Sequence, residues 1–431
     1  MTNIPWIKSS LNSARAVSIY AAVVCFLAYL SIFTFRKAFN VAAFQGYSLW
    51  GLDYKVVIVI TQVFGYMLSK FVGIRIIAEL KHHGRGWLIL GLVGMSWLAW
   101  LAFALIPPPY NFWCLFFNGF PLGFIWGIVF SYVEGRRATD FIGAALAVSF
   151  IFGSGVAKSV AQYLMEQWQI SEYWMPFWVG ALFALPLVGL IYLMEQIPEP
   201  DAEDIKQRTR RQPMTKKERK DFVHTFLPGV VLLVMVYILV TILREVRDGF
   251  MADMWRESGE IFESSVFAAT ESWVSVIILI VMASLVLVKN NYRAFNIVLW
   301  IILGGFALTG LSSWFYMQGY LSIFAWMTLV GLGLYLVYIP YNSMLFDRFL
   351  AAFQYAGTVG FLIYLADSCG YIGSVAILLT KTIFKFEVNW LSFFIRLTTI
   401  AALIGGFSTL LSWYYFRCKY YHLDSRTQST E

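Results

Sequence analysis

Two arginines lie inside apolar stretches at matching positions in the two halves of the chain. Arg36 follows Tyr29 by seven residues, and Arg244 follows Tyr237 by seven residues. A guanidinium group in hydrocarbon costs roughly 2.5–3.5 kcal/mol on insertion scales, so an arginine within a membrane span indicates a functional site. Two such residues at equivalent points of related halves predict a site for an anion.

Other basic residues in apolar runs extend this candidate site. Lys70 has long apolar flanks on both sides, which favours a position lining a cavity over one that reaches the membrane surface. Lys158 is closer to a helix end, and both positions stay open for it. Arg247 shares a helix face with Arg244, and Arg244 could pair with Asp248 four residues later.

One acidic residue, Asp367, is near the middle of an apolar run and has no basic residue close to it in sequence. We expect it to face a cavity or to pair across helices, with Lys158 or Arg36 as the partner. Four tyrosines whose positions suit the same cavity are expected to line it: Tyr29, Tyr66, Tyr237 and Tyr338.

An alternative interpretation places some of these cations at the membrane surface. Arg36 and Lys37 could close the first span and extend their charged ends to the interface. Arg247 beside Asp248 could be an interface residue as readily as a ligand. Arg396, near the end of the last apolar run, is expected to be an interface residue.

The elements that carry these residues are membrane helices. Hydrophobic residues make up 59% of the 431-residue chain and charged residues 13%, about half the charged fraction usual in soluble domains. Apolar runs near the ~20 residues needed to span a bilayer predict an all-α polytopic membrane protein of twelve helices. The predicted spans are 17–44, 54–78, 86–106, 112–133, 141–164, 174–195, 222–250, 267–288, 294–315, 320–346, 355–380 and 391–416.

A polar, Pro-bearing and densely charged segment, 196–221, divides the spans six and six. It predicts a cytoplasmic linker between two pseudo-symmetric six-helix bundles, 1–195 and 222–431. A soluble catalytic domain would need at least ~50 residues, and no loop is that long. The sequence has no phosphate loop, zinc-ligand spacing or nucleophile motif, and its four cysteines are scattered. We therefore expect no enzyme activity, no metal and no cofactor.

Lysine and arginine positions set the expected orientation. With both termini inside, the predicted cytoplasmic segments hold 20 Lys and Arg residues and the outer loops hold four. This asymmetry predicts a multi-pass protein of the inner (cell) membrane with both termini in the cytoplasm. The basic cytoplasmic surface then faces the anionic lipid of the bilayer. This explains the net charge of +7, and nucleic acid is not an expected partner.

Several segments resemble one transporter family. Twelve spans in a 6+6 arrangement with a basic central loop look like the major facilitator superfamily. Residues 35–40, 66–71 and 247–253 resemble motifs on spans one, two and seven of its organophosphate:phosphate antiporters, the branch that contains the glycerol-3-phosphate and hexose-phosphate transporters. Residues 356–361 and 370–374 are similar to that branch's span eleven, with four more residues between the two parts.

The resemblance implies roles for individual residues. In that branch an arginine on each of spans one and seven binds phosphate and a lysine on span two assists. These roles carry over to Arg36 and Lys70, and on span seven to Arg244 by its position in the half or to Arg247 by the motif. The branch's span-five histidine has no counterpart, and Lys158 is one turn beyond that region.

The expected function is secondary active transport by alternating access of a small organic anion, a phosphate ester, in exchange for inorganic phosphate, by a monomer. One alternative is proton-coupled symport of an organic anion or sugar, with Asp367 or Glu245 carrying the proton. Another is a transporter-like membrane sensor that binds an anion and signals through 196–221.

Overall fold

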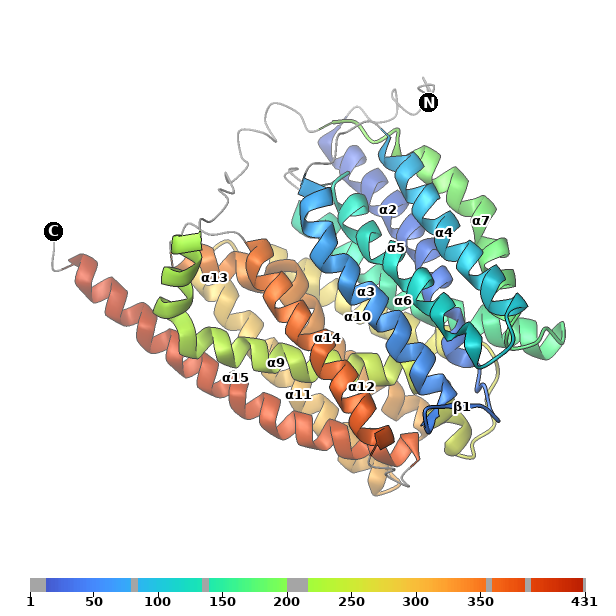
Figure 1. The fold of residues 1–431 in the computed structure, drawn as a ribbon. Helices are drawn as coiled ribbons and strands as arrows, with labels where there is room; N and C mark the ends of the chain where they lie inside the picture. The colour runs from blue at the N-terminus through green and yellow to red at the C-terminus, as the bar shows by residue number, and fades with distance from the viewer. Residues whose placement is uncertain are drawn as a thin grey trace. The chain divides into compact units, whose positions relative to one another are not determined.

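The computed structural model describes residues 13–78, 84–133, 139–199, 216–353, 359–383 and 389–428, and these are almost entirely helical (Figure 1). The long helices are α2 (Ala14–Lys37), α3 (Tyr54–Ala78), α4 (Arg85–Leu105), α5 (Trp113–Phe130), α6 (Thr139–Gln167), α7 (Met175–Met194), α9 (Lys216–Glu257), α10 (Val266–Val286), α11 (Asn291–Met317), α12 (Ile323–Pro340), α14 (Val359–Ile383) and α15 (Trp390–Gln428). The short elements are the 3-10 turns η1 (Ala38–Val41) and η2 (Tyr110–Phe112), the strands β1 (Ser48–Leu49) and β2 (Leu52–Asp53), the π-turn η3 (Tyr341–Leu345) and α13 (Phe346–Ala352). The two strands pair antiparallel, Ser48 with Asp53.

A long helix is present at each of the twelve ranges predicted from the apolar runs. Ten helices in the described part of the chain are long and apolar enough to cross a membrane. Helices α3 and α14 are not among these ten, so the count of twelve spans stays a prediction.

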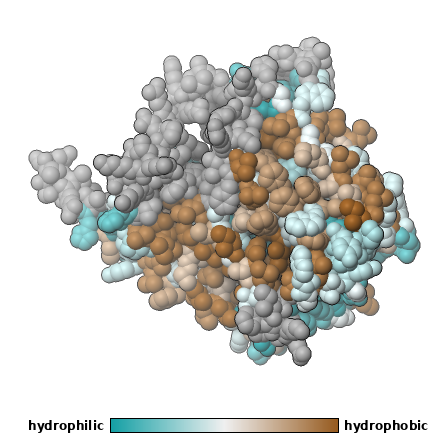
Figure 2. Space-filling model, viewed as in Figure 1, coloured by the Kyte–Doolittle hydropathy of each residue, from teal (hydrophilic) through white to brown (hydrophobic). Residues whose placement is uncertain are grey.

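Large apolar side chains are exposed on many of these helices. Trp87 is 69% exposed, Leu185 81% and Leu403 71%. The face drawn in Figure 2 is largely hydrophobic over the described helices. In water such a surface would promote aggregation, whereas the apolar chains of a lipid bilayer solvate it. The chain is therefore a multi-pass membrane protein.

Side-chain oxygens cap several helix starts. Ser13 accepts a hydrogen bond from the Ala16 amide at 3.2 Å, Asn290 from Arg293 at 2.9 Å and Ser322 from Ala325 at 3.3 Å. Such caps satisfy amides that have no partner inside the helix. Within the helices the backbone satisfies its own hydrogen bonds, which is the condition for crossing hydrocarbon.

By backbone contacts the chain divides into two units whose borders differ from the two sequence halves. Unit 1 comprises residues 1–208, 246–279 and 375–391, and unit 2 comprises 209–245, 280–374 and 392–431. The predicted bundles 1–195 and 222–431 stay a prediction, and residues 200–215 of the predicted linker lie outside the described part. Helix α9 contributes to both units and has non-helical dihedral angles at Phe250 (φ −122°, ψ 15°).

In unit 1, α2 packs against α6 and α7, and α3 packs against α5. Small residues permit close approaches there: a Cβ atom at Gly155 of α6 would lie 2.6 Å from the Phe267 carbonyl oxygen at the start of α10. In unit 2, α11 packs against α12 and α13. A Cβ atom at Gly370 of α14 would lie 2.8 Å from Oγ1 of Thr241 on α9. Glycine at both positions therefore permits the close helix approach.

Candidate functional site

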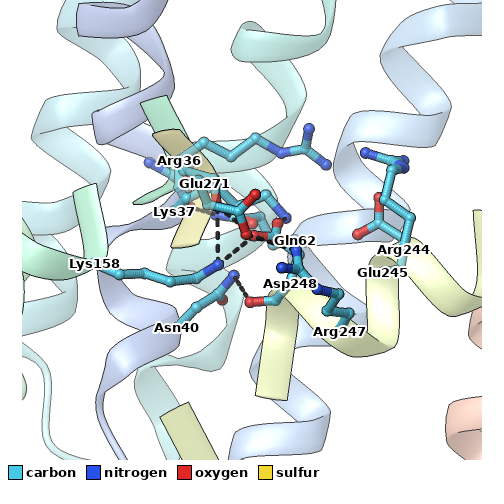
Figure 3. A network of polar contacts seen from close by, with 12 residues as sticks. Arg36, Lys37, Asn40, Gln62, Lys158, Arg244, Glu245, Arg247, Asp248 and Glu271 are labelled. Atoms are coloured by element: carbon cyan, nitrogen blue, oxygen red, sulfur yellow. Dashed lines mark hydrogen bonds and ion pairs between the residues drawn. The ribbon is translucent and has the colours of Figure 1, made fainter. Parts of the chain in front are cut away.

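Arg36 lies in the last turn of α2, and side chains from three other helices hold the backbone there. The side-chain amide of Gln62 donates to the Arg36 carbonyl at 2.9 Å (Figure 3). The Asn118 amide and the Trp100 indole N–H both donate to the Phe35 carbonyl, at 3.1 and 2.6 Å. Carbonyls at a helix end lack partners within the helix, and in a low-dielectric interior these donors satisfy them. The position of Arg36 is therefore fixed by α3, α4 and α5.

The Arg36 guanidinium stacks on an aromatic ring that it shares with a second cation. Its central carbon lies 3.6 Å from the ring centroid of Tyr66 and 5.9 Å from that of Phe33. Lys70, one turn after Tyr66 on α3, places Nζ 5.1 Å from the same Tyr66 ring and 5.8 Å from the Trp126 ring. Two predicted ligands thus converge on one tyrosine, which is also a predicted site residue.

The Asp248 carboxylate on α9 forms ion pairs and a hydrogen bond with several side chains of unit 1. It forms ion pairs with Lys37 and Lys158 and accepts a hydrogen bond from the Ser154 hydroxyl. Asn40 donates to the Asp248 main-chain carbonyl at 3.2 Å. Figure 3 shows the lysine at 158 and the amide at 40 directed toward this residue. Asp248 therefore neutralises two buried ammonium groups at once.

Arg247 forms a separate ion pair with a carboxylate on α10. Its Nη1 lies 2.6 Å from Oε1 of Glu271, and both side chains are buried. Gly155 packs directly against the Glu271 side chain, so α6 and α10 approach closely at this ion pair. The interpretation of Arg247 as a membrane-interface residue is wrong, because its side chain is only 2% exposed.

Charge is unbalanced in this part of unit 1. Four cations and two carboxylates form what we call the basic cluster: Arg36, Lys37, Lys158, Arg247, Asp248 and Glu271. Lys70 adds a half-buried cation beside it. Buried charges are costly unless compensated, so a surplus of buried cations within one unit is a feature of a site for anions.

Unit 2 holds the second set of predicted residues. Nη2 of Arg244 lies 2.5 Å from Oε1 of the adjacent Glu245, and its guanidinium carbon lies 4.4 Å from the Tyr338 ring centroid. Tyr237 stacks on Tyr338, with ring centroids 5.5 Å apart, and donates its hydroxyl to Asp367. The Tyr338 ring thus lies against this arginine as the Tyr66 ring lies against Arg36.

One alternative interpretation and two expectations about partners are corrected. Arg36 and Lys37 do not extend to the membrane surface, because they are 3% and 2% exposed. Asp367 pairs across helices as expected, but the partner is the Tyr237 hydroxyl of α9 instead of Lys158 or Arg36. Asp248 contacts two lysines of other helices instead of the arginine one turn before it. For Asp248, packing between helices outweighs the nearest partner along the sequence.

The other predicted residues are placed as follows. Lys158 is fully buried, which excludes the surface interpretation for it, and Arg396 is exposed, as expected. Tyr29 is buried and packs against Phe33, 6.1 Å between centroids, so it lies one ring away from the guanidinium of the α2 arginine. Residues 356–358 of the span-eleven motif lie outside the described part of the chain.

Sequence reasoning missed four contributors: Gln62, Asn118, Glu271 and the double role of Asp248. A signal existed for Glu271, an acidic residue inside the apolar run 267–288, and such residues are functional candidates by default. The amides Gln62 and Asn118 are also polar residues within predicted spans. Their role depends on which carbonyls they meet, which no spacing rule supplies.

The helical arrangement and apolar surface define a membrane protein with the major facilitator fold. The chain is similar to the crystal structure of the human organic anion transporter MFSD10 (TETRAN), with a TM-score of 0.55, 12% identity, and coverage of 92% of this chain and 99% of that one. At this identity the likeness is one of fold. A family model matches residues 38–419, and the chain belongs to the Family of unknown function (DUF5690). No curated protein matches the chain.

Proposed function

We propose that this protein is a transporter that carries a small organic anion across the membrane, with Arg36 as the principal contact to the negative charge. The observation that supports this most is the pair of cations, Arg36 and Lys70, on the single ring of Tyr66. Ring faces attract cations without neutralising them. A negatively charged group can therefore bind both cations while they remain held by the ring.

The energetic argument concerns the surplus of positive charge in the basic cluster. Each arginine or lysine at membrane depth costs roughly 2.5–3.5 kcal/mol on insertion scales. A bound anion would compensate part of that cost through charge-assisted hydrogen bonds, which are about twice as strong as neutral ones. Arg36 offers a planar fork suited to carboxylate or phosphate, while Lys70 offers a point charge.

The fold supports a transport cycle. The human protein with a similar fold is an organic anion transporter, and we extend that activity to this chain. In the proposed cycle of alternating access, the site opens to one side of the membrane at a time and the bound anion lowers the cost of closing it. Arg244 enters the proposal from the sequence analysis as a second contact to the anion.

The finer part of the proposal is exchange of a phosphate ester for inorganic phosphate. It rests on the resemblance of residues 35–40 and 66–71 to the organophosphate:phosphate antiporters. A proton-coupled mechanism is the main alternative. Its candidate carriers are Glu245, which is ion-paired with Arg244, and Asp367, which accepts a hydrogen bond from Tyr237.

We also propose that both termini and segment 196–221 face the cytoplasm of a cell whose inner membrane holds the protein. A cysteine introduced as Gln207→Cys should not react with an impermeant maleimide added to intact cells. Ile261→Cys is the matched control, because Ile261 is fully exposed in a segment predicted to lie outside. Equal labelling of the two variants would overturn the orientation.

The transport proposal is tested in proteoliposomes loaded with inorganic phosphate. Labelled phosphate, phosphate esters and organic carboxylates are supplied outside, and uptake of at least one is expected to exceed that of protein-free vesicles. Arg36→Ala should abolish this uptake, while Arg396→Ala, a change of an exposed arginine, should retain it. Equal uptake by both variants would overturn the role of Arg36. Specific binding without flux would support the sensor instead.

A further inference from the structure

We infer that the anion recognised at Arg36 has an apolar, preferably aromatic body instead of a polyhydroxylated one. This inference rests on the proposed function and narrows its substrate class. It concerns the uncharged part of the ligand, because the cations determine only the charge of the group that they bind. Its basis is the chemistry of the side chains beside Arg36 within unit 1.

The first observation is that rings form the surroundings of the two cations. Tyr66 and Phe33 lie within 6 Å of the Arg36 guanidinium carbon, and Tyr66 and Trp126 lie within 6 Å of the Lys70 ammonium. A ring of the ligand can stack against such faces or meet their edges, and aromatic pairs of this kind contribute beyond the area they bury.

The second observation is that the amide N–H groups nearby are already engaged. The Gln62 side-chain amide donates to the Arg36 carbonyl and to Oδ1 of Asn118. The Asn118 amide donates to the Phe35 carbonyl and to the carbonyl and hydroxyl of Ser96. These donors hold the end of α2, and giving them to a ligand would release the backbone that positions Arg36.

Two hydroxyl groups on the same helices are used in the same way. Thr34 donates to the Ser31 carbonyl at 2.7 Å, and Ser69 donates to the Tyr66 carbonyl at 2.6 Å. Each of these bonds closes within its own helix. Serine and threonine that bond their helix backbone are poor donors to a ligand.

A polyol such as glycerol phosphate would therefore bury hydroxyl groups against rings and engaged donors. Burying a hydroxyl without a hydrogen bond is unfavourable, and sites discriminate strongly on such groups. An aromatic anion brings the same negative charge without that cost. The side chains beside Arg36 should therefore bind an aromatic anion more tightly than a polyol anion of the same charge.

Unit 2 carries the same combination independently. Arg244 lies over the Tyr338 ring, and Tyr338 stacks on Tyr237. The Asn342 amide donates to the Tyr237 hydroxyl and to the Tyr338 carbonyl. There too the arginine is accompanied by rings while the amide is committed to the protein.

The test varies the charged group and the body of the ligand separately. Binding of phenyl phosphate, glycerol phosphate, benzoate and glycerate to the purified protein is measured by calorimetry. Phenyl phosphate should bind at least about tenfold more tightly than glycerol phosphate, and benzoate at least about tenfold more tightly than glycerate. Tighter binding of the glycerol compounds would overturn this inference and leave the proposed function standing. Binding of none of the four would overturn both.

Variants of Tyr66 separate the ring from its hydroxyl. Tyr66→Phe keeps the ring and should preserve the preference for phenyl phosphate over glycerol phosphate. Tyr66→Leu should reduce that preference severalfold while glycerol phosphate binding changes less. Thermal unfolding in detergent shows whether each variant is folded. An unchanged preference in a folded Tyr66→Leu variant would overturn the inference.

Discussion

Arg36 in unit 1 and Arg244 in unit 2 differ mainly in how their charge is compensated. Arg244 has a carboxylate on the next residue, Glu245, at 2.5 Å. Arg36 shares the Tyr66 ring with Lys70 and belongs to a cluster in which cations outnumber carboxylates. Both arginines lie on tyrosine rings, and the basic cluster around Arg36 holds four cations and two carboxylates among the described residues. Equivalent positions in the sequence therefore do not make two arginines equivalent as ligands.

The largest expected effect concerns the stability of unit 2. Arg244→Ala leaves the buried Glu245 carboxylate without its guanidinium, and breaking a buried pair in this way costs about 3–5 kcal/mol. Thermal unfolding in detergent should show a clear loss of stability for Arg244→Ala. The double variant Arg244→Ala with Glu245→Ala should recover much of it. If the double variant is no more stable than the single one, the ion pair does not dominate at this position.

Anion binding should depend most on Arg36. Removing a charge-assisted contact in a low-dielectric site costs roughly 2–5 kcal/mol, or about 30- to 4000-fold in affinity. We expect Arg36→Ala to lose binding on this scale, and Arg36→Lys to recover only part of it because an ammonium is not a planar fork. Calorimetry with the tightest-binding anion measures both. Near-normal binding by Arg36→Ala would show that the surplus charge serves structure alone.

A smaller effect is expected at the residue that positions Arg36 without touching the ligand. Asn118→Leu leaves buried carbonyls with fewer donors, a loss of about 1–3 kcal/mol. The variant should bind the anion more weakly, and a higher ligand concentration should recover full uptake because it restores occupancy of the weakened site. Ser96→Ala, which removes one acceptor of the same amide, is the milder control. Loss of stability with unchanged affinity would limit Asn118 to a structural role.

The smallest expected effect is that of Asp367→Asn on coupling. Because the carboxylate accepts a hydrogen bond from Tyr237, the amide should preserve that contact and lower stability only modestly. Under the exchange mechanism, wild-type uptake against internal phosphate should be flat from about pH 5 to pH 8. A pH gradient that drives accumulation in the wild type but not in Asp367→Asn would instead assign a proton to this residue.

The positions of the helices were accessible from the sequence because crossing hydrocarbon demands long apolar runs, whatever the partners. Helix ends were less accessible: α9 covers Lys216–Glu257, whereas the apolar run is 222–250, because polar turns extend the helix beyond the apolar run. The π-turn after Pro340 was also not predicted. It follows a residue that has no backbone N–H to donate, a local effect that hydropathy does not register.

The candidate site was accessible in part. A charged residue in an apolar run can be recognised from the sequence alone, and Arg36 and Lys70 were predicted as site residues for this reason. Their partners depend on contacts between helices far apart in sequence. Asp248 meets Lys37 and Lys158 rather than the nearer Arg244, because side-chain direction and helix packing decide the pairing. The carbonyls held by Gln62 and Asn118 are equally invisible to spacing rules.

The ion pair between Lys37 and Asp248 also has a consequence for how the chain is made. Lys37 ends the first long helix, whereas Asp248 is synthesised only after α3 to α7 have emerged from the ribosome. During that interval the basic end of α2 must be accommodated in the membrane without its carboxylate. The order of synthesis therefore leaves the Lys37 ammonium without this ion pair until α9 has been made, and the cost of burying that charge is compensated by Asp248 only then.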